Sequence, residues 1–308
     1  MSDPIIFSDT FLAMGAPCDV VLPNVEESFA KKVFQQIKNE VEQIENAISR
    51  FSAVSSIWEI NATPANTWVS VSNELWEILS ICSDFYEMSN GAFDVTIAPL
   101  SLLCKENESP TEAEIGQALK KCGFDKLELD LEKHQLKFTE EGMELDFGSI
   151  EKGFVLDLLK PMLFDLGISN AIISFQEDVV LAAGTHPSGE SWPLGIRNLR
   201  NPVEFNHVFA VSDQMVTTAG TVFIRDDGEG IKKRQIISPA DGWLIDGDKT
   251  VSVKADSATM AQFISHIWLI LPEEDKSILS DQFKNIEILE VEYLDDDIRT
   301  RLSILEGE

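Results

Sequence analysis

The sequence predicts an α+β fold in which helices cover β-sheets, and three observations lead to this prediction. Apolar residues recur every three or four positions from Phe29 to Phe51, as on one face of a long amphipathic helix. Segments such as KLELDL at 126–131 alternate apolar and polar residues, which is typical of strands with one exposed face. Further strand candidates, separated by Gly, Pro, Asn and Asp, follow in the second half of the chain.

Periodicity and turn residues predict the elements of the first 150 residues. They are helices at about 29–51 and 73–88, a helix that begins at 109–111, and strands at 126–131, 135–138 and 143–148. The second helix ends near Asn90-Gly91, where a left-handed cap is inexpensive. Ser109, Pro110 and Thr111 supply the cap and first turn of the third helix. The three strands are most simply an antiparallel meander.

The rest of the chain predicts three helices among seven strands. The helices lie at 150–167, 257–270 and 273–283, and the strands at 170–175, 179–184, 192–198, 208–212, 250–255, 286–294 and 300–305. Pro161 is expected to kink the first of these helices, and Gly167 ends it. No repeat, low-complexity segment or Pro/Gly/Ser linker divides the chain. We therefore expect residues 1–308 to form one composite domain.

The chain is strongly acidic. It has 308 residues, 44% of them hydrophobic, with 24 Lys plus Arg against 53 Asp plus Glu, which gives a formal net charge of −29. The length and the apolar share allow a packed core in one large or two ordinary domains, at about 100 to 200 residues per domain. The negative charge repels phosphate backbones and anionic headgroups, so we expect neither a nucleic-acid nor a membrane partner. A small anionic ligand needs local positive charge.

Cysteine usage and the N-terminal segment predict a cytoplasmic protein. Cys18, Cys82, Cys104 and Cys122 have no CxxC spacing and are too few for a disulfide framework, so we expect small core residues in a reducing compartment. No apolar run reaches the ~18 residues of a membrane span. The first 15 residues lack the basic and apolar regions of a secretion signal.

Two segments carry residue types suited to anion or metal binding. In GSIEKG at 148–153, two glycines flank Lys152 at the start of a helix, where free N–H groups and a cation suit a phosphate; the alternative is a surface lysine among acids. Gln262 and His266 lie four residues apart on one helix face, the spacing of two ligands. The alternative for His266 is a hydrogen-bonded residue at the edge of the core. No GxSxG, HExxH, GxGxxG or P-loop pattern is present.

Seven segments in one order, from Met14 to about Ile270, resemble the ApbE family, the FAD:protein FMN transferases. The segments are MGAPCDV, QIENAISRFSAVSSIWEIN, NGAFDVTIAPL, LDFGSIEKGFVLDLL, TTAGT, QIISPADGW and VSVKADSATMAQFISHIWLI. The resemblance implies T-fold-like layers of sheets covered by helices, with FAD between the sheet layers and a divalent ion, usually Mg²⁺, near the pyrophosphate. It also implies transfer of FMN to a Ser or Thr hydroxyl of a target protein with release of AMP; some relatives hydrolyse FAD.

By position, the resemblance assigns cofactor contacts to residues from every part of the chain. Lys152 matches the family's lysine; the other cofactor positions are Met14, Ser49, Arg50, Asn61, Asp94, Thr96, Gln176, Glu177, Gln235 and Pro239. Lys152, Gln262 and His266 stand at the catalytic positions. Glu151, through its backbone carbonyl, Gln262 and His266 stand where the family holds its metal.

Departures from the family pattern concentrate at the metal. Gln262 replaces an aspartate and His266 a threonine, which removes the anionic ligand that a hard cation prefers. Gln176 and Glu177 replace a Gly-Gly pair, and Gln235 replaces a histidine. Two hypotheses follow.

In the first hypothesis, Glu151, Asp256 or His266 supplies a substitute ligand and the chain still turns over FAD. In the second, the fold persists as a flavin or nucleotide binder, or as an interaction module.

Overall fold

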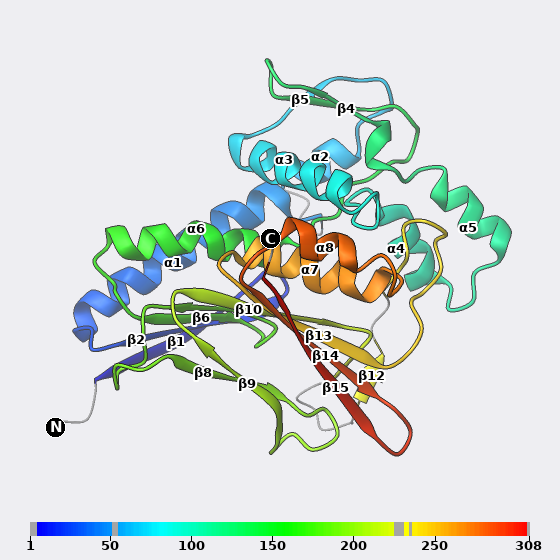
Figure 1. Ribbon diagram of the computed structural model, residues 1–308. Coiled ribbons are helices and arrows are strands. Elements are labelled where there is room, and N and C mark those ends of the chain that lie inside the picture. The colour runs from blue at the N-terminus through cyan, green and yellow to red at the C-terminus, as the bar shows by residue number, and fades with distance from the viewer. Residues whose placement is uncertain (1–4, 51–54, 225–230, 234–235, 307–308) are drawn as a thin grey trace. The chain divides into compact units, whose positions relative to one another are not determined.

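The computed structural model describes residues 5–50, 55–224, 231–233 and 236–306 (Figure 1). The chain forms two compact units. The first contains residues 1–42, 150–234 and 246–308, and the second contains residues 43–149 and 235–245. The mixture of helices and antiparallel sheets confirms the predicted α+β fold. The single composite domain over residues 1–308 stays a prediction.

The first unit is built on an eight-stranded antiparallel sheet with the order β1-β2-β6-β7-β10-β13-β14-β15. Its strands are β1 (Ile6–Ala13), β2 (Ala16–Pro23), β6 (Ala171–Phe175), β7 (Val179–Ala183), β10 (Gln214–Gly220), β13 (Lys249–Ala255), β14 (Ile286–Tyr293) and β15 (Ile298–Leu305). Two small ladders accompany it: β8 (Trp192–Arg197) with β9 (Phe205–Val211), and β11 (Val222–Ile224) with β12 (Ile231–Lys233).

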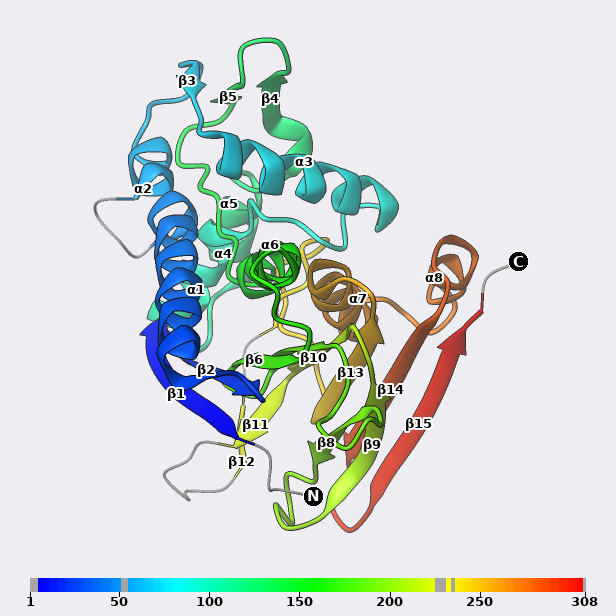
Figure 2. The ribbon, with the colours of Figure 1, turned by 90° about the vertical axis from the view of Figure 1, so that its left-hand side faces the viewer.

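Helices cover one face of this sheet, as Figure 2 shows. They are α6 (Glu151–Asp165), α7 (Ala258–Ile270) and α1 (Glu27–Ile48), whose last turns belong to the second unit; α8 (Ser277–Gln282) follows α7. Phe34 of α1 meets Phe7 and Phe11 of β1 edge to face, which fixes α1 on this edge of the sheet. On the other face, Trp192 and Phe209 of the β8–β9 hairpin pack in one apolar cluster with residues of β10 and β14.

The second unit combines short helices with a three-stranded sheet of order β3-β5-β4. Its elements are α2 (Ser56–Asn61), β3 (Val69–Ser70), α3 (Asn73–Met88), α4 (Ala98–Glu106), α5 (Glu112–Leu119), the 3₁₀ turn η1 (Phe124–Lys126), β4 (Leu127–Asp130) and β5 (Gln135–Phe138). Leu100, Cys104, Ile115 and Ile237 contribute to one of its apolar clusters.

Several helix predictions are confirmed by their caps. The helix at 73–88 has both predicted ends, with Ser72 as N-cap and with Asn90 and Gly91 in the left-handed region. Thr111 and Glu114 form a capping box at the start of α5. In the part of the chain that the structure describes, no helix is long and apolar enough to cross a membrane.

Two strand-level predictions are wrong. Residues 143–148 alternate buried and less buried side chains but form no strand, because the Asn61 side chain occupies both backbone groups of Leu145. The third strand of that sheet is β3, which lies at 69–70. The segment TTAGT at 217–221, interpreted as a loop, lies largely within β10.

Candidate functional site

The first unit places the start of α6 against α7. The backbone N–H of Gly153, the third residue of α6, donates to Gln262 Oε1 at 2.5 Å. This N–H is one of those at a helix start that have no partner within the helix, so Gln262 caps α6 from a neighbouring helix. A Cβ at position 153 would lie 2.6 Å from both Ala258 O and Gln262 Oε1, so only glycine permits this helix approach.

Asp157 provides the converse cap. Its carboxylate accepts hydrogen bonds from Ser257 Oγ at 2.7 Å, Ala258 N at 2.8 Å, Thr259 N at 2.9 Å and Thr259 Oγ1 at 2.5 Å. A carboxylate beside the first turn of a helix also interacts favourably with the helix dipole. The two helices therefore cap each other, α6 through Asp157 and α7 through Gln262. Sequence reasoning missed Asp157, although an acid within the apolar run VLDLL was a possible signal.

The other predicted residues of these helices lie close by. Glu151 and Lys152 are the first two residues of α6, and His266 is one turn after Gln262 on α7; all three are half-buried. Asp256, which precedes α7, is exposed and accepts a hydrogen bond from Gln214 Nε2 at 3.0 Å.

This corner does not fit the divalent cation that the resemblance implies. Gln262 Oε1 is neutral and already accepts the Gly153 N–H, and the Asp157 carboxylate serves four donors. Among the described residues, no group of three or more His, Cys, Asp or Glu side chains could hold a metal ion. Mg²⁺ prefers carboxylate and phosphate oxygens in octahedral geometry. The arrangement therefore does not support Gln262 as a metal ligand, and the assignment of Glu151 and His266 stays a prediction.

The turn between β6 and β7 keeps a backbone that favours glycine. Gln176 and Glu177 have φ angles of 52° and 61°, in the left-handed region. Both are exposed, and Glu177 forms an ion pair with Arg197 at 2.9 Å. This turn therefore places two side chains on a left-handed backbone that glycine adopts without strain. Gln176 N donates to Pro17 O at 3.0 Å, which ties this turn to β2.

Met14 lies in the neighbouring turn. Met14 and Gly15 connect β1 to β2 with φ angles of 51° and 68°, as a two-residue type I′ hairpin requires. Met14 is buried despite its place in a turn. Because β2 pairs with β6, the structure brings Met14 and Gln176 to the same end of these strands.

A series of contacts connects this end of the sheet to α6. Thr218 N of β10 donates to Asp178 O of the β6–β7 turn at 2.7 Å. The adjacent Thr217 Oγ1 lies 3.5 Å from Ser265 Oγ of α7, and α7 carries Gln262. Four of the seven family-like segments therefore form one continuous series of contacts with the β6–β7 turn. The hydroxyls of half-buried Thr218 and buried Ser252 lie 2.8 Å apart in the same region, and Ser252 was not predicted.

In the second unit, the predicted site residue Arg50 forms an ion pair within the protein. Its side chain is 7% exposed and donates from Nη1 to Asp146 Oδ2 at 2.7 Å, with Glu144 at 3.7 Å from Nη2. Asp146 Oδ1 also accepts the N–H of Gly148, which orders the loop before α6. Ser49 contributes its carbonyl to Ser55 Oγ at 2.5 Å.

Three other predicted residues of this unit serve its internal structure. Asn61 pairs with Leu145 through both amide atoms, at 2.9 and 3.0 Å. Asp94 Oδ1 accepts from the N–H and hydroxyl of Thr96, both at 2.7 Å, and Thr96 Oγ1 accepts from Gly123 N at 2.7 Å. Burial raises the pKa of the Asp94 carboxyl, although the hydrogen bonds from Thr96 oppose this.

The remaining predicted positions lie at residues 235–242. Pro239 is half-buried in a turn that is closed by Gly242 N to Ser238 O at 2.8 Å. Gly242 needs its φ of 76°, and a Cβ there would meet Ile115 at 2.6 Å. Gln235 lies outside the described residues.

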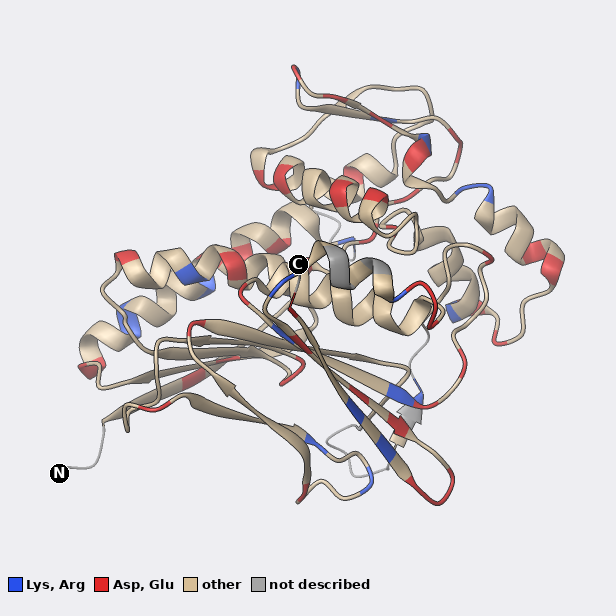
Figure 3. Cartoon of the chain, viewed as in Figure 1, with Lys and Arg blue, Asp and Glu red and all other residues tan. Residues whose placement is uncertain are grey.

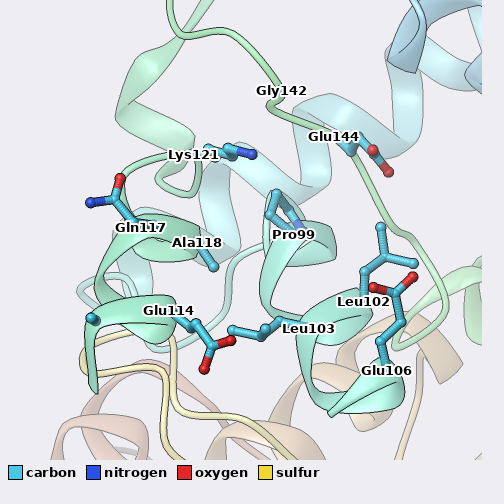
Figure 4. Close-up of a pocket in the computed structure, with 11 residues that line it drawn as sticks. Pro99, Leu102, Leu103, Glu106, Glu114, Gln117, Ala118, Lys121, Gly142 and Glu144 are labelled. Atoms are coloured by element: carbon cyan, nitrogen blue, oxygen red, sulfur yellow. The ribbon is translucent and has the colours of Figure 1, made fainter. Parts of the chain in front are cut away.

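A separate hollow of about 530 Å³ opens in the second unit between α4, α5 and residues 142–144 (Figure 4). Leu102, Leu103 and Ala118 give it apolar walls, and Glu106, Glu114 and Glu144 add carboxylates. Among the described residues that line it, none is a predicted site residue. The hollow and the predicted site are therefore different features.

The fold and these contacts define an α+β protein in which four of the family-like segments meet at one sheet and two helices that cap each other. The model of the ApbE family matches residues 14–289, and the chain belongs to this family.

Known relatives agree with this assignment. The chain is 25% identical over 264 residues to a FAD:protein FMN transferase of Klebsiella pneumoniae, covering 83% of this chain and 80% of that protein. It is 24% identical to one of Treponema pallidum, covering 96% and 86%. The flavin transferase ApbE of Vibrio cholerae has a similar fold, with a TM-score of 0.83, 18% identity and 97% coverage of both chains. The apo flavinyl transferase ApbE of Pseudomonas stutzeri also gives 0.83, at 21% identity, covering 98% and 96%.

Proposed function

We propose that this chain binds FAD and transfers its FMN part to a target protein, as the names of its relatives describe, and that the acceptor is a Ser or Thr hydroxyl. The observation that supports this is the series of contacts in the first unit. It joins four of the segments that resemble the family, at the Met14 turn, β10, α7 and the start of α6, by way of the β6–β7 turn. Substantial divergence in sequence has left their adjacency intact.

The reaction is a displacement at phosphorus. The target hydroxyl oxygen attacks the phosphorus of the FMN half, and the bond from that phosphorus to the bridging oxygen breaks. AMP leaves with the electron pair, and the hydroxyl proton is released to solvent. This chemistry depends on holding the pyrophosphate in place and on offsetting its negative charge. Lys152, in the first turn of α6, is the residue we assign to the phosphate, with the helix N-terminus beside it.

The test is to incubate the purified full chain with FAD, Mg²⁺ and a peptide that contains one acceptor Thr. Expected products are AMP and a peptide heavier by one FMN, both measured by mass spectrometry. A peptide with Ala in place of the Thr is the control for labelling. The same test resolves FAD hydrolysis, which gives AMP and free FMN without labelled peptide. Absence of FAD binding would refute the proposal.

Lys152→Met should weaken FAD binding by about tenfold to a hundredfold, because one charge-assisted contact contributes about 1.5 to 3 kcal/mol. Lys32→Met removes the same charge from an exposed position of α1 and should leave binding unchanged.

A second function, FAD binding without transfer, is favoured by Gln262. This residue is neutral and engaged with the start of α6, so a negatively charged cation ligand is lacking at that position. In that case FAD would stay intact in the assay above. Bound, uncleaved FAD after prolonged incubation would decide for this second function.

We further propose a cytoplasmic location. The four cysteines are buried and form no disulfide, which agrees with a reducing compartment. Cell fractionation with antibodies against the native chain tests this location.

A further inference from the structure

The reciprocal caps of α6 and α7 determine which charges can face a nucleotide here. Gln262 uses its amide oxygen on Gly153 N, and Asp157 uses both carboxylate oxygens on the first turn of α7. Both side chains form hydrogen bonds that join the two helices. Neither contributes a free anionic oxygen at the start of α6.

The geometry around Gly153 makes this arrangement tight. The ideal Cβ position at 153 lies 2.6 Å from Gln262 Oε1 and 2.6 Å from Ala258 O. The Gln262 head group therefore lies directly against the α6 backbone. An aspartate at position 262 is one methylene shorter, so its charged oxygens would stop short of the place that the amide oxygen now occupies.

The charge change has a direct consequence for cation binding. Affinity for hard divalent cations depends on the number of charged oxygen ligands, and Mg²⁺ gives up its water reluctantly. A neutral amide that already accepts a hydrogen bond is a poor replacement for a carboxylate. The nearby Lys152, by contrast, is a basic side chain of this chain itself and needs no metal.

We infer that nucleotide binding by this chain does not depend on a divalent cation. Gln262 closes the position at which a cation would approach α6, and Lys152 with the α6 N-terminus supplies the positive charge toward the pyrophosphate. This inference rests on the proposed FAD binding. It gives Gln262 the role of a positioning residue that acts through the α6 backbone.

The first test uses the unmodified full chain. FAD is titrated by fluorescence in Mg²⁺ and, separately, in EDTA. The two dissociation constants should agree within about twofold. Binding that is tenfold weaker in EDTA would overturn the inference while leaving the proposed FAD binding in place. No binding in either buffer would refute both.

The second test restores the charge. Gln262→Asp should make FAD binding at least about tenfold tighter in Mg²⁺ than in EDTA, because a carboxylate then becomes available. Gln36→Asp adds the same charge at an exposed position of α1 and should show no such difference. Calorimetry with MgCl₂ alone should detect ion binding by the Gln262→Asp chain and not by the unmodified chain. Ion binding of equal affinity by both chains would contradict the inference, even if Gln262→Asp bound no FAD.

Discussion

Asp157 offers the sharpest test of the helix pairing. In Asp157→Ala, the N–H groups of Ala258 and Thr259 lose their acceptor, and neither can rotate toward another one. Both residues are buried, at 0% and 4% exposure. A hydrogen bond to a charged group contributes about 1.5 to 3 kcal/mol. Because water can replace part of the lost bonding, we expect the two backbone donors alone to lower the free energy of unfolding by about 3 to 4 kcal/mol. The two hydroxyl donors can turn elsewhere, and Ser257 already caps Met260.

Asp157→Asn should cost about half as much. Its remaining oxygen can serve the three donors now on Oδ2, whereas the amide NH₂ faces Ala258 N and loses that bond. Asp165→Asn is the matched control, because Asp165 is the exposed last residue of α6 and an acid there interacts unfavourably with the helix dipole. This control should change stability by less than about 0.5 kcal/mol.

The assay combines urea unfolding, followed by circular dichroism, with hydrogen exchange of the peptide that spans the start of α7. Two compact units can unfold separately, so the exchange measurement assigns the loss to the first unit. Equal stability of the Ala and Asn variants, or unchanged exchange at Ala258 and Thr259, would refute the reasoning.

Three further predictions use local geometry and titration. Replacing Gln176 and Glu177 together by glycine should stabilise the chain by roughly 1 kcal/mol in thermal melts, because two left-handed residues lose their strain and only an exposed ion pair is lost; destabilisation would contradict this. Burial raises the pKa of the Cys18 thiol to about 12, so a thiol reagent at pH 8 should leave this residue unmodified in native protein and modify it in denaturant. Hydrogen bonding, first of all from Arg301, lowers the pKa of Glu273 to about 2. The stabilisation from this depressed pKa is present above its ordinary value of 4.5 and is lost as pH falls toward 2, so Glu273→Gln should flatten that part of the stability profile.

Local signals in the sequence predicted the long helices α1, α3, α6 and α7 but missed the short helices α2 and α4. The stripe in α1 is buried at Val33, Ile37, Val41 and Ile44, as the three-and-four spacing requires. Among strands that are covered on both faces, β6 and β7 were predicted, whereas β10 was missed. The edge strand β1 was missed because it exposes Leu12 and has no clean alternation.

The site was less predictable because its contacts join distant positions. Gln262 and Gly153 are 109 residues apart, and Asp157 is about 100 residues from the turn that it caps. Helix spacing placed Gln262 and His266 on one face but could not indicate which atom the amide contacts. In the same way, Asn61 was predicted to be a cofactor contact. Its amide instead forms the two backbone hydrogen bonds that a neighbouring strand would otherwise give Leu145.

The net charge of the chain and the local charge at the start of α6 have opposite signs. Figure 3 shows acidic residues spread over helices and loops of the described chain, with basic residues between them. At physiological ionic strength, charges interact over about 8 Å, so the net charge of −29 governs long-range repulsion while Lys152 governs the α6 N-terminus. An acidic chain and an anionic ligand are therefore compatible, provided that the local cation is retained.

The reciprocal caps also explain how family-like segments can persist while their chemistry changes. The segment around Gly153 and the segment around Gln262 are bound to each other by hydrogen bonds that stabilise the α6–α7 pair whether or not a nucleotide is turned over. The order of motifs indicates ancestry and fold, whereas the reaction depends on whether residue 262 carries an amide or a carboxylate. For this reason the charge at Gln262, and not the number of matching segments, is the property on which activity should depend.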